Sequence, residues 1–198
     1  MKRKAVFLDR DGTINIDKSY LYKIEDFAYQ EGAKEGMKLL QEAGYLLIII
    51  TNQSGIARGY YVEEDYKRLH DWLISDLSSD GIHITEAYHC PHHPDALVKQ
   101  YRKRCKCRKP EIGLFLRAAK ELDIDFEQSY AIGDKMRDLQ ICKERGVRGF
   151  LLYSDKVNIE RTEKSYIKKI KGGILEAAVQ ILQTETDDYN ATMDKRGY

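Results

Sequence analysis

The strongest constraint on the fold is a short apolar run near the start of the chain that ends abruptly in polar residues. Ala5-Val6-Phe7-Leu8 is followed directly by Asp9-Arg10-Asp11-Gly12. Such a run, bounded by turn residues, is typical of a strand buried on both faces of a parallel sheet. Functional groups of open α/β sheets collect at the carboxyl ends of strands, so two carboxylates stand where chemistry is expected. A strand that merely ends in an Asx turn would read the same way.

Two further apolar runs end in polar residues that suit phosphate chemistry. Residues 46–50 lead into Thr51-Asn52-Gln53-Ser54-Gly55, and Ala131-Ile132 leads into Gly133-Asp134. Lys109 precedes a helical pattern between these two runs. Carboxylates are ligands that Mg²⁺ prefers, while cations and hydroxyls bind phosphate oxygens. Together the segments contain the parts of a magnesium-dependent phosphoryl-transfer site.

The rest of the chain alternates between strand and helix patterns. We expect strands near residues 4–9, 45–51, 86–90, 129–133 and 148–153, and helices near residues 32–43, 62–79, 112–123, 136–145 and 172–183. This alternation predicts a parallel sheet covered by helices on both faces, a three-layer Rossmann-like α/β fold. Residues 1–183 are expected to form a single domain. Residues 184–198 are polar and lack periodicity, which predicts a frayed tail.

Composition excludes several classes of protein. The net charge of the 198 residues is +1, which gives no global field for nucleic acid binding. No apolar stretch approaches transmembrane length, and the apolar run after the basic start is too short for a signal peptide. We therefore expect a cytoplasmic monomer that acts on a small molecule, with neither nucleic acid nor membrane as partner.

Three of the four cysteines gather in a short segment beside a histidine. Cys90-Pro91-His92-His93 is followed by Cys105-Lys106-Cys107. A cytoplasmic setting argues against disulfides, and Cys₃His is a common ligand set for tetrahedral zinc. We expect a structural Zn²⁺ site formed by Cys90, His92, Cys105 and Cys107, with His93 as the alternative histidine. Such a site would anchor the loop 90–107, and with it the cations that follow at Arg108 and Lys109.

Taken together and in order, the motifs resemble those of the haloacid dehalogenase-like phosphatases. The matching segments are Asp9-Arg10-Asp11-Gly12-Thr13, Thr51-Asn52, Lys109, and Gly133-Asp134 with Asp138. The resemblance spans residues 4 to about 153 and implies this family's parallel-sheet fold. About 35 residues separate the first two strands, which leaves room for one flap and one helix and so for a minimal cap only.

The resemblance implies a role for each matched residue. Asp9 would be the nucleophile and Asp11 the general acid/base. Mg²⁺ would be held by Asp9, the backbone carbonyl of Asp11, and Asp134. Substrate contacts would come from Thr51, Asn52, Gln53, Arg58, Arg108, Lys109 and Lys135. Asp138 would either orient the metal's waters or be an ordinary acid on a helix surface.

The cysteine loop and the segment 51–59 narrow the resemblance to the heptose 1,7-bisphosphate phosphatases. That subgroup's activity implies hydrolysis of the C7 phosphate of a sugar bisphosphate, in a pathway that supplies heptose for lipopolysaccharide. Histidinol-phosphate phosphatases share the zinc loop and the strand-end motifs, and they remain the alternative, with other small sugar-phosphate phosphatases. A non-catalytic binding member of the fold is a third hypothesis, which the intact acidic motifs and Lys109 argue against.

Overall fold

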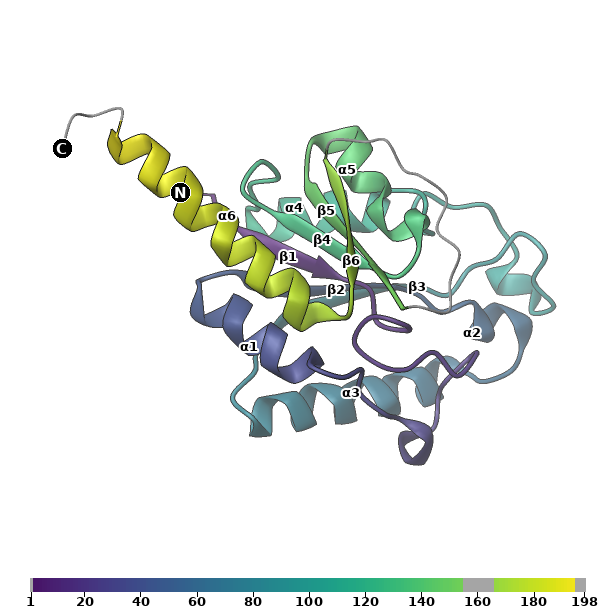
Figure 1. The fold of residues 1–198 in the computed structure, drawn as a ribbon. Coiled ribbons are helices and arrows are strands. Elements are labelled where there is room, and N and C mark those ends of the chain that lie inside the picture. Colours follow the sequence, from purple (N-terminus) through teal and green to yellow (C-terminus); the bar gives the residue numbers. More distant parts are fainter. Residues whose placement is uncertain (1, 155–165, 195–198) are drawn as a thin grey trace.

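A computed structural model of the chain describes residues 2–154 and 166–194, and it contains one six-stranded parallel sheet (Figure 1). The strand order is β3-β2-β1-β4-β5-β6. The strands are β1 (Ala5–Leu8), β2 (Leu46–Asn52), β3 (Ile84–Cys90), β4 (Tyr130–Gly133), β5 (Arg148–Tyr153) and β6 (Ile167–Lys171). Because β1 lies between β2 and β4, the motifs that follow these strands meet at one edge of the sheet.

Helices cover both faces of the sheet, as the alternating pattern predicted. The α-helices are α1 (Ala33–Glu42), α2 (Ser54–Arg58), α3 (Glu63–Ser79), α4 (Gly113–Leu122), α5 (Gln140–Arg145) and α6 (Ile174–Asp194). In Figure 1, α1, α3 and α6 lie on one side of the sheet and α4 and α5 on the other. Short 3₁₀ turns η1 (Ile24–Asp26), η2 (Lys99–Tyr101) and η3 (Met136–Leu139) complete the described elements.

Alternate residues of β1 supply the two cores. Val6 and Leu8 belong to the core on the side of α1 and α6, whereas Ala5 and Phe7 belong to the core on the side of α4. The Phe7 ring packs edge-on against Phe115 of α4, with centroids 5.2 Å apart. All four β1 residues are buried, so this strand is a fixed base for the carboxylates that follow it.

The five expected strands are confirmed, but strand β6, helix α2 and the 3₁₀ turns η1 and η2 were missed. β6 has the sequence Ile-Lys-Lys-Ile-Lys, and α2 has only five residues. β6 is an edge strand whose lysines are typical of strands that avoid further pairing, so its apolar pattern is weak. α2 is too short to show a helical period. The helix expected over 136–145 is divided into η3 and α5.

The frayed tail expected from residue 184 is corrected by the structure, because α6 continues to Asp194. Glu185 on this part of the helix accepts hydrogen bonds from Lys4 Nζ at 2.7 Å and from the Tyr45 hydroxyl at 2.5 Å. These contacts join the helix to residues more than a hundred positions earlier, and sequence periodicity carries no trace of them. Residues 195–198 of the expected tail lie outside the described residues.

Within residues 2–154 and 166–194, no helix is both long enough and apolar enough to cross a membrane.

Candidate active site

A buried ion pair between Asp9 and Lys109 lies at the carboxyl end of the sheet. Asp9 follows β1 directly, and its Oδ1 lies 2.6 Å from Lys109 Nζ. The ammonium also donates to the Ile50 carbonyl at 2.6 Å and lies 2.8 Å from Asp138 Oδ1. Lys109 and Asp9 expose only 2% and 7% of their side chains, so the pair is shielded from solvent. Three oxygens thus hold the ammonium beside the Asp9 carboxylate.

Asp138 is buried, which removes the helix-surface alternative for this residue. Its side chain is 3% exposed. Oδ2 accepts a hydrogen bond from the Lys135 backbone amide at 3.1 Å, which places the carboxylate at the start of η3. Oδ1 faces Lys109. Asp138 therefore both shapes the turn after β4 and faces the Lys109 ammonium.

Two glycines allow these carboxylates to approach the backbone. A Cβ atom on Gly12, which has φ of +97°, would lie 2.4 Å from Asp134 Oδ2. A Cβ atom on Gly133 would lie 2.5 Å from the Cβ of Asp138. Glycine at both positions is needed for the acids after β4 to reach the end of β1.

The donor set at this edge fits a divalent cation. Carboxylate oxygens of Asp9, Asp134 and Asp138 all lie within 4.8 Å of one another. Asp134 Oδ1 is buried without a hydrogen-bond partner among the described residues, and such an oxygen is available as a ligand. Lys109 pairs with Asp9 and Asp138, and Lys135 lies 3.2 Å from Asp134, so two ammonium groups face three carboxylates. The remaining negative charge suits an ion such as Mg²⁺.

Burial and neighbouring charges together shift the pKa values of Asp9 and Lys109. Burial raises the pKa of Asp9, and the Lys109 ammonium opposes that rise. Burial by itself would lower the pKa of Lys109, but the carboxylates of Asp9 and Asp138 raise it. A cation bound beside Asp9 would favour its ionised, nucleophilic form.

The Asp11 carboxylate is held by three side chains. Oδ2 accepts from Arg10 Nη2 and from Gln53 Nε2, both at 2.9 Å. Oδ1 accepts from Asn15 Nδ2 at 3.1 Å and from Arg10 Nη2 at 3.0 Å. The Arg10 guanidinium is 1% exposed and lies over the Tyr66 ring. Asp11 is therefore fixed in one orientation near Asp9.

The residues after β2 contact the site in different ways. Thr51 is buried, and its hydroxyl oxygen accepts from Gln53 Nε2 at 2.8 Å, so the hydroxyl proton stays available for a phosphate oxygen. The Asn52 side chain donates to the Lys109 carbonyl and accepts from the Lys109 amide, at 3.0 and 3.1 Å. In this structure Asn52 therefore positions the backbone of Lys109.

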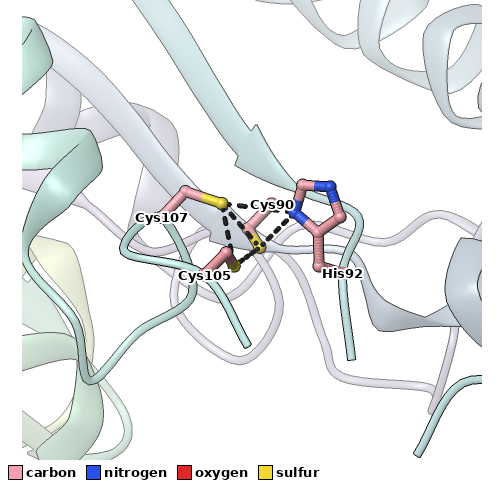
Figure 2. A group of neighbouring side chains, drawn as sticks. All are labelled: Cys90, His92, Cys105 and Cys107. Atoms are coloured by element: carbon pink, nitrogen blue, oxygen red, sulfur yellow. Dashed lines mark hydrogen bonds between the residues drawn. The ribbon is translucent and has the colours of Figure 1, made fainter. Parts of the chain in front are cut away.

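The cysteine cluster forms as the spacing predicted (Figure 2). The three Sγ atoms of Cys90, Cys105 and Cys107 lie 3.0–3.5 Å apart. His92 Nδ1 lies 3.6 Å from Cys90 Sγ and 3.3 Å from Cys107 Sγ. These separations approach the edge of about 3.8 Å expected for a tetrahedron with Zn–S bonds of about 2.3 Å. The four ligand atoms thus fit a zinc-sized ion.

His92, and not His93, points to the thiols. His93 Nε2 lies 3.1 Å from Arg58 Nη2, and its Nδ1 accepts from the Asp95 amide at 3.1 Å. The alternative assignment of His93 to the cysteine cluster is therefore wrong.

Known proteins are similar to this chain in sequence and in fold. A profile of the HAD-hydrolase-like family matches residues 106–175. A D-glycero-beta-D-manno-heptose-1,7-bisphosphate 7-phosphatase of Haemophilus ducreyi is 48% identical over 149 residues, which are 75% of this chain and 81% of that protein. A D-glycero-alpha-D-manno-heptose-1,7-bisphosphate 7-phosphatase of Photorhabdus laumondii is 44% identical over 167 residues, 84% of this chain and 91% of that protein.

This chain belongs to the heptose bisphosphate phosphatase family of haloacid dehalogenase-like hydrolases. Among solved structures, the D,D-heptose 1,7-bisphosphate phosphatase of B. bronchiseptica, complexed with magnesium and phosphate, superposes with a TM-score of 0.76 at 27% identity. The match covers 91% of this chain and 99% of that one. The parallel-sheet fold and the phosphatase class expected from the sequence are confirmed.

In this member of the heptose bisphosphate phosphatase family, several cations lie beside the carboxylates of Asp9, Asp134 and Asp138. Arg108 donates from Nη1 to the His92 carbonyl at 3.3 Å, so the cysteine loop positions it. Burial lowers the pKa of Arg108, and the nearby cations Arg137 and Arg58 lower it further. Lys135 Nζ lies 3.1 Å from Asp17 and 3.2 Å from Asp134. Repulsion among the three arginines would be relieved by an anion.

Sequence reasoning missed several residues that contact the candidate site. Arg10, Asn15 and Tyr61 contact the Asp11 network, and Arg137 joins the other arginines. Arg10 left one signal, since it is a charged residue in the turn directly after a buried strand. Asn15, Tyr61 and Arg137 stand in no recognisable spacing, and only the folded chain brings them to the site.

Proposed function

We propose that this chain hydrolyses the C7 phosphate of D-glycero-D-manno-heptose 1,7-bisphosphate and releases heptose 1-phosphate and inorganic phosphate. The observation that carries the proposal is the buried Asp9–Lys109 pair among further carboxylates, in a chain whose relatives bear this activity in their names. Catalysis of phosphoryl transfer depends mainly on such pre-positioned charges.

In the first step, a carboxylate oxygen of Asp9 attacks phosphorus and forms an acyl-phosphate bond. The bond between phosphorus and the sugar oxygen breaks, and Asp11 gives its proton to that oxygen. Lys109 and the Thr51 hydroxyl bind the non-bridging oxygens, where negative charge is spread during transfer.

In the second step, Asp11 takes a proton from water as the water oxygen attacks phosphorus. The bond between phosphorus and Asp9 breaks, inorganic phosphate leaves, and the Asp9 carboxylate is restored. Asp11 is protonated again for the next substrate. One residue thus acts as acid and then as base, which requires that its carboxylate be held in place.

Two metals complete the proposal. Mg²⁺ would be held by Asp9, Asp134 and the backbone carbonyl of Asp11, and when bound it neutralises charge on the phosphate oxygens. Asp138 would not bind the metal directly. It would hold the Lys109 ammonium and the backbone amide of Lys135 in place. Zn²⁺ would be held by Cys90, His92, Cys105 and Cys107 and would fix the loop that carries Arg108 and Lys109.

The second phosphate of the substrate would bind the cations beside the acidic site. Arg108, Lys135 and Arg58 are the candidates, joined by Arg137. A cation that forms an ion pair within the protein would leave its partner to bind the phosphate. Lys135, for example, would leave Asp17. The Gln53 amide is fully occupied by protein groups, so it would support the site without touching substrate.

A phosphate-release assay tests the function. The α and β anomers of the heptose bisphosphate and histidinol phosphate would be compared by kcat/KM, since relatives carry either anomer in their names. The proposal expects one or both anomers to exceed histidinol phosphate by at least about tenfold, the effect of about 1.4 kcal/mol of added binding by a second phosphate. Preference for histidinol phosphate would favour the alternative activity, and absence of turnover on every phosphate would favour a binding member of the fold.

A further inference from the structure

Tyr61 lies behind the active site and makes one short hydrogen bond. Its hydroxyl donates to Gln53 Oε1 at 2.6 Å, and the side chain is buried. Neither the motifs nor the proposed mechanism gives Tyr61 a task. Its ring stacks against Tyr22, with centroids 5.3 Å apart and planes inclined by 20°.

The space for this ring is built into α2. A Cβ atom on Gly55 would lie only 2.1 Å from Cε1 of Tyr61. The glycine after Ser54 therefore lets the ring pack directly on the helix backbone, and Tyr22 packs against the ring as well. A ring held in this way fixes the position of its hydroxyl.

Gln53 transmits that position to Asp11. Its Oε1 accepts from Tyr61 and from Arg10 Nη2, the latter at 3.3 Å. Its Nε2 donates to Asp11 Oδ2 at 2.9 Å and to Thr51 Oγ1 at 2.8 Å. All four hydrogen-bonding positions of the amide are filled.

Arg10 and Asp11 decide which way the Gln53 amide faces. If the amide were turned over, its NH₂ group would meet the Arg10 guanidinium, and its carbonyl oxygen would meet the Asp11 carboxylate. Both contacts would be repulsive or unpaired. Arg10, which can only donate, and the Asp11 carboxylate, which accepts, thus keep the NH₂ group toward Asp11. The hydrogen bond from the Tyr61 hydroxyl holds the Oε1 end of the amide in place.

We propose that Tyr61 is a positioning residue for proton transfer, which acts through Gln53 to hold the Asp11 carboxylate against the leaving oxygen. This inference rests on the proposed function, because it assumes that Asp11 is the general acid. It extends that function to a residue outside the motifs.

The test measures how kcat/KM depends on the leaving group of the substrate. A merely structural role of Tyr61 would not change that dependence. Tyr61→Phe keeps the ring and removes the hydroxyl. A sugar alkoxide needs a proton to leave, whereas 4-nitrophenolate leaves without one. We expect kcat/KM for the heptose bisphosphate, or for unsubstituted phenyl phosphate, to fall about tenfold, and that for 4-nitrophenyl phosphate to fall less than about twofold. Because kcat/KM covers only the steps through phosphoenzyme formation, the later base role of Asp11 does not interfere.

Two further variants sharpen the test. Tyr22→Phe is the matched control, because it removes a hydroxyl from the other ring of the same stacked pair. The Tyr22 hydroxyl makes no hydrogen bond to the Gln53 amide, whose four positions are filled by other groups. Gln53→Met removes the relay, so adding Tyr61→Phe to it should cause no further loss. Equal losses of Tyr61→Phe on all aryl phosphates, or a further loss in the double variant, would overturn the proposal.

These outcomes separate the inference from the proposed substrate. The aryl phosphate series reports on Asp11 whichever sugar phosphate the enzyme prefers. A wild-type enzyme that hydrolyses the series but not the heptose bisphosphate would contradict the proposed substrate, and a flat response to Tyr61→Phe within the series would contradict the role of Tyr61.

Discussion

Lys109 Nζ lies 2.6 Å from Asp9 Oδ1, and a hundred residues of sequence separate the two. Asp9 is placed by the central strand β1, whereas Lys109 follows the cysteine loop and is held through its backbone by Asn52. The carboxylate that we propose as nucleophile is therefore paired with a cation from a different part of the chain.

Replacing Lys109 by Met should harm both activity and stability. The change leaves buried carboxylates without their cation, and breaking such a pair costs about 3–5 kcal/mol. We expect kcat/KM to fall at least about a hundredfold, because the charge that binds the phosphoryl oxygens is lost. Phosphate release and thermal unfolding measure the two effects. Lys120→Met, an exposed lysine on α4, is the control. Near-normal turnover of Lys109→Met would place the phosphate elsewhere.

Asp9→Asn and Asp11→Asn should differ in what they leave intact. Asp9→Asn removes the nucleophile, so both turnover and the phosphoenzyme should be lost. Asp11→Asn should lose turnover of the sugar substrate but bind Mg²⁺ nearly as wild type, since the ligand from this residue would be its backbone carbonyl. Acid-quench trapping of phosphoenzyme and magnesium titration provide the measurements. Phosphate release by Asp9→Asn at a near-normal rate would contradict its assignment.

The cysteine cluster should bind about one zinc ion per chain, with Zn–S distances near about 2.3 Å. Metal analysis of protein purified without chelator, followed by X-ray absorption, tests this expectation. Cys107→Ser should lose zinc and activity together, because Arg108 and Lys109 follow Cys107 directly. Cys142→Ser changes a thiol in α5, outside the cluster, and should keep the zinc. Zinc-free protein with full activity would remove the loop's proposed role.

Arg108→Ala should distinguish a bisphosphate from a simple phosphate. If Arg108 binds the second phosphate, the variant should lose about 1.5–3 kcal/mol of transition-state binding with the heptose bisphosphate. Hydrolysis of an aryl phosphate, which lacks that group, should hardly change. Lys109→Ala should impair both substrates, because Lys109 would contact the phosphoryl group during transfer. The ratios of kcat/KM isolate the difference. Equal losses on both substrates for Arg108→Ala would place Arg108 at the reacting phosphate instead.

Local patterns in the sequence were sufficient to predict five of the six strands of the central sheet and the residues at their ends. Buried strands of a parallel sheet read as continuous apolar runs, and turn residues mark where each one ends. The position of Asp9, Thr51 and Asp134 at one edge of the sheet therefore follows from the sequence. The Cys90, His92, Cys105 and Cys107 spacing is likewise local, because a metal-binding loop needs its ligands close together in the chain.

Contacts between segments that are distant in the chain could not be predicted from sequence patterns. Whether Asp138 lies on a surface or faces Lys109 depends on how closely η3 packs on β4, which Gly133 permits. The second half of α6 is polar, and its contacts with Lys4 and Tyr45 leave no periodicity. β6 shows a weak apolar pattern because it is an edge strand.

The chemical groups of the active site were determined by the sequence itself, since residue type and strand position follow from the chain alone. Their contacts were decided by the tertiary structure. The Asn52 side chain holds the Lys109 backbone, the Gln53 amide is filled on all sides, and Tyr61 reaches Asp11 through it. A hydrogen bond depends on distances of tenths of an ångström between groups far apart in sequence, and only the packing of the whole fold sets such distances.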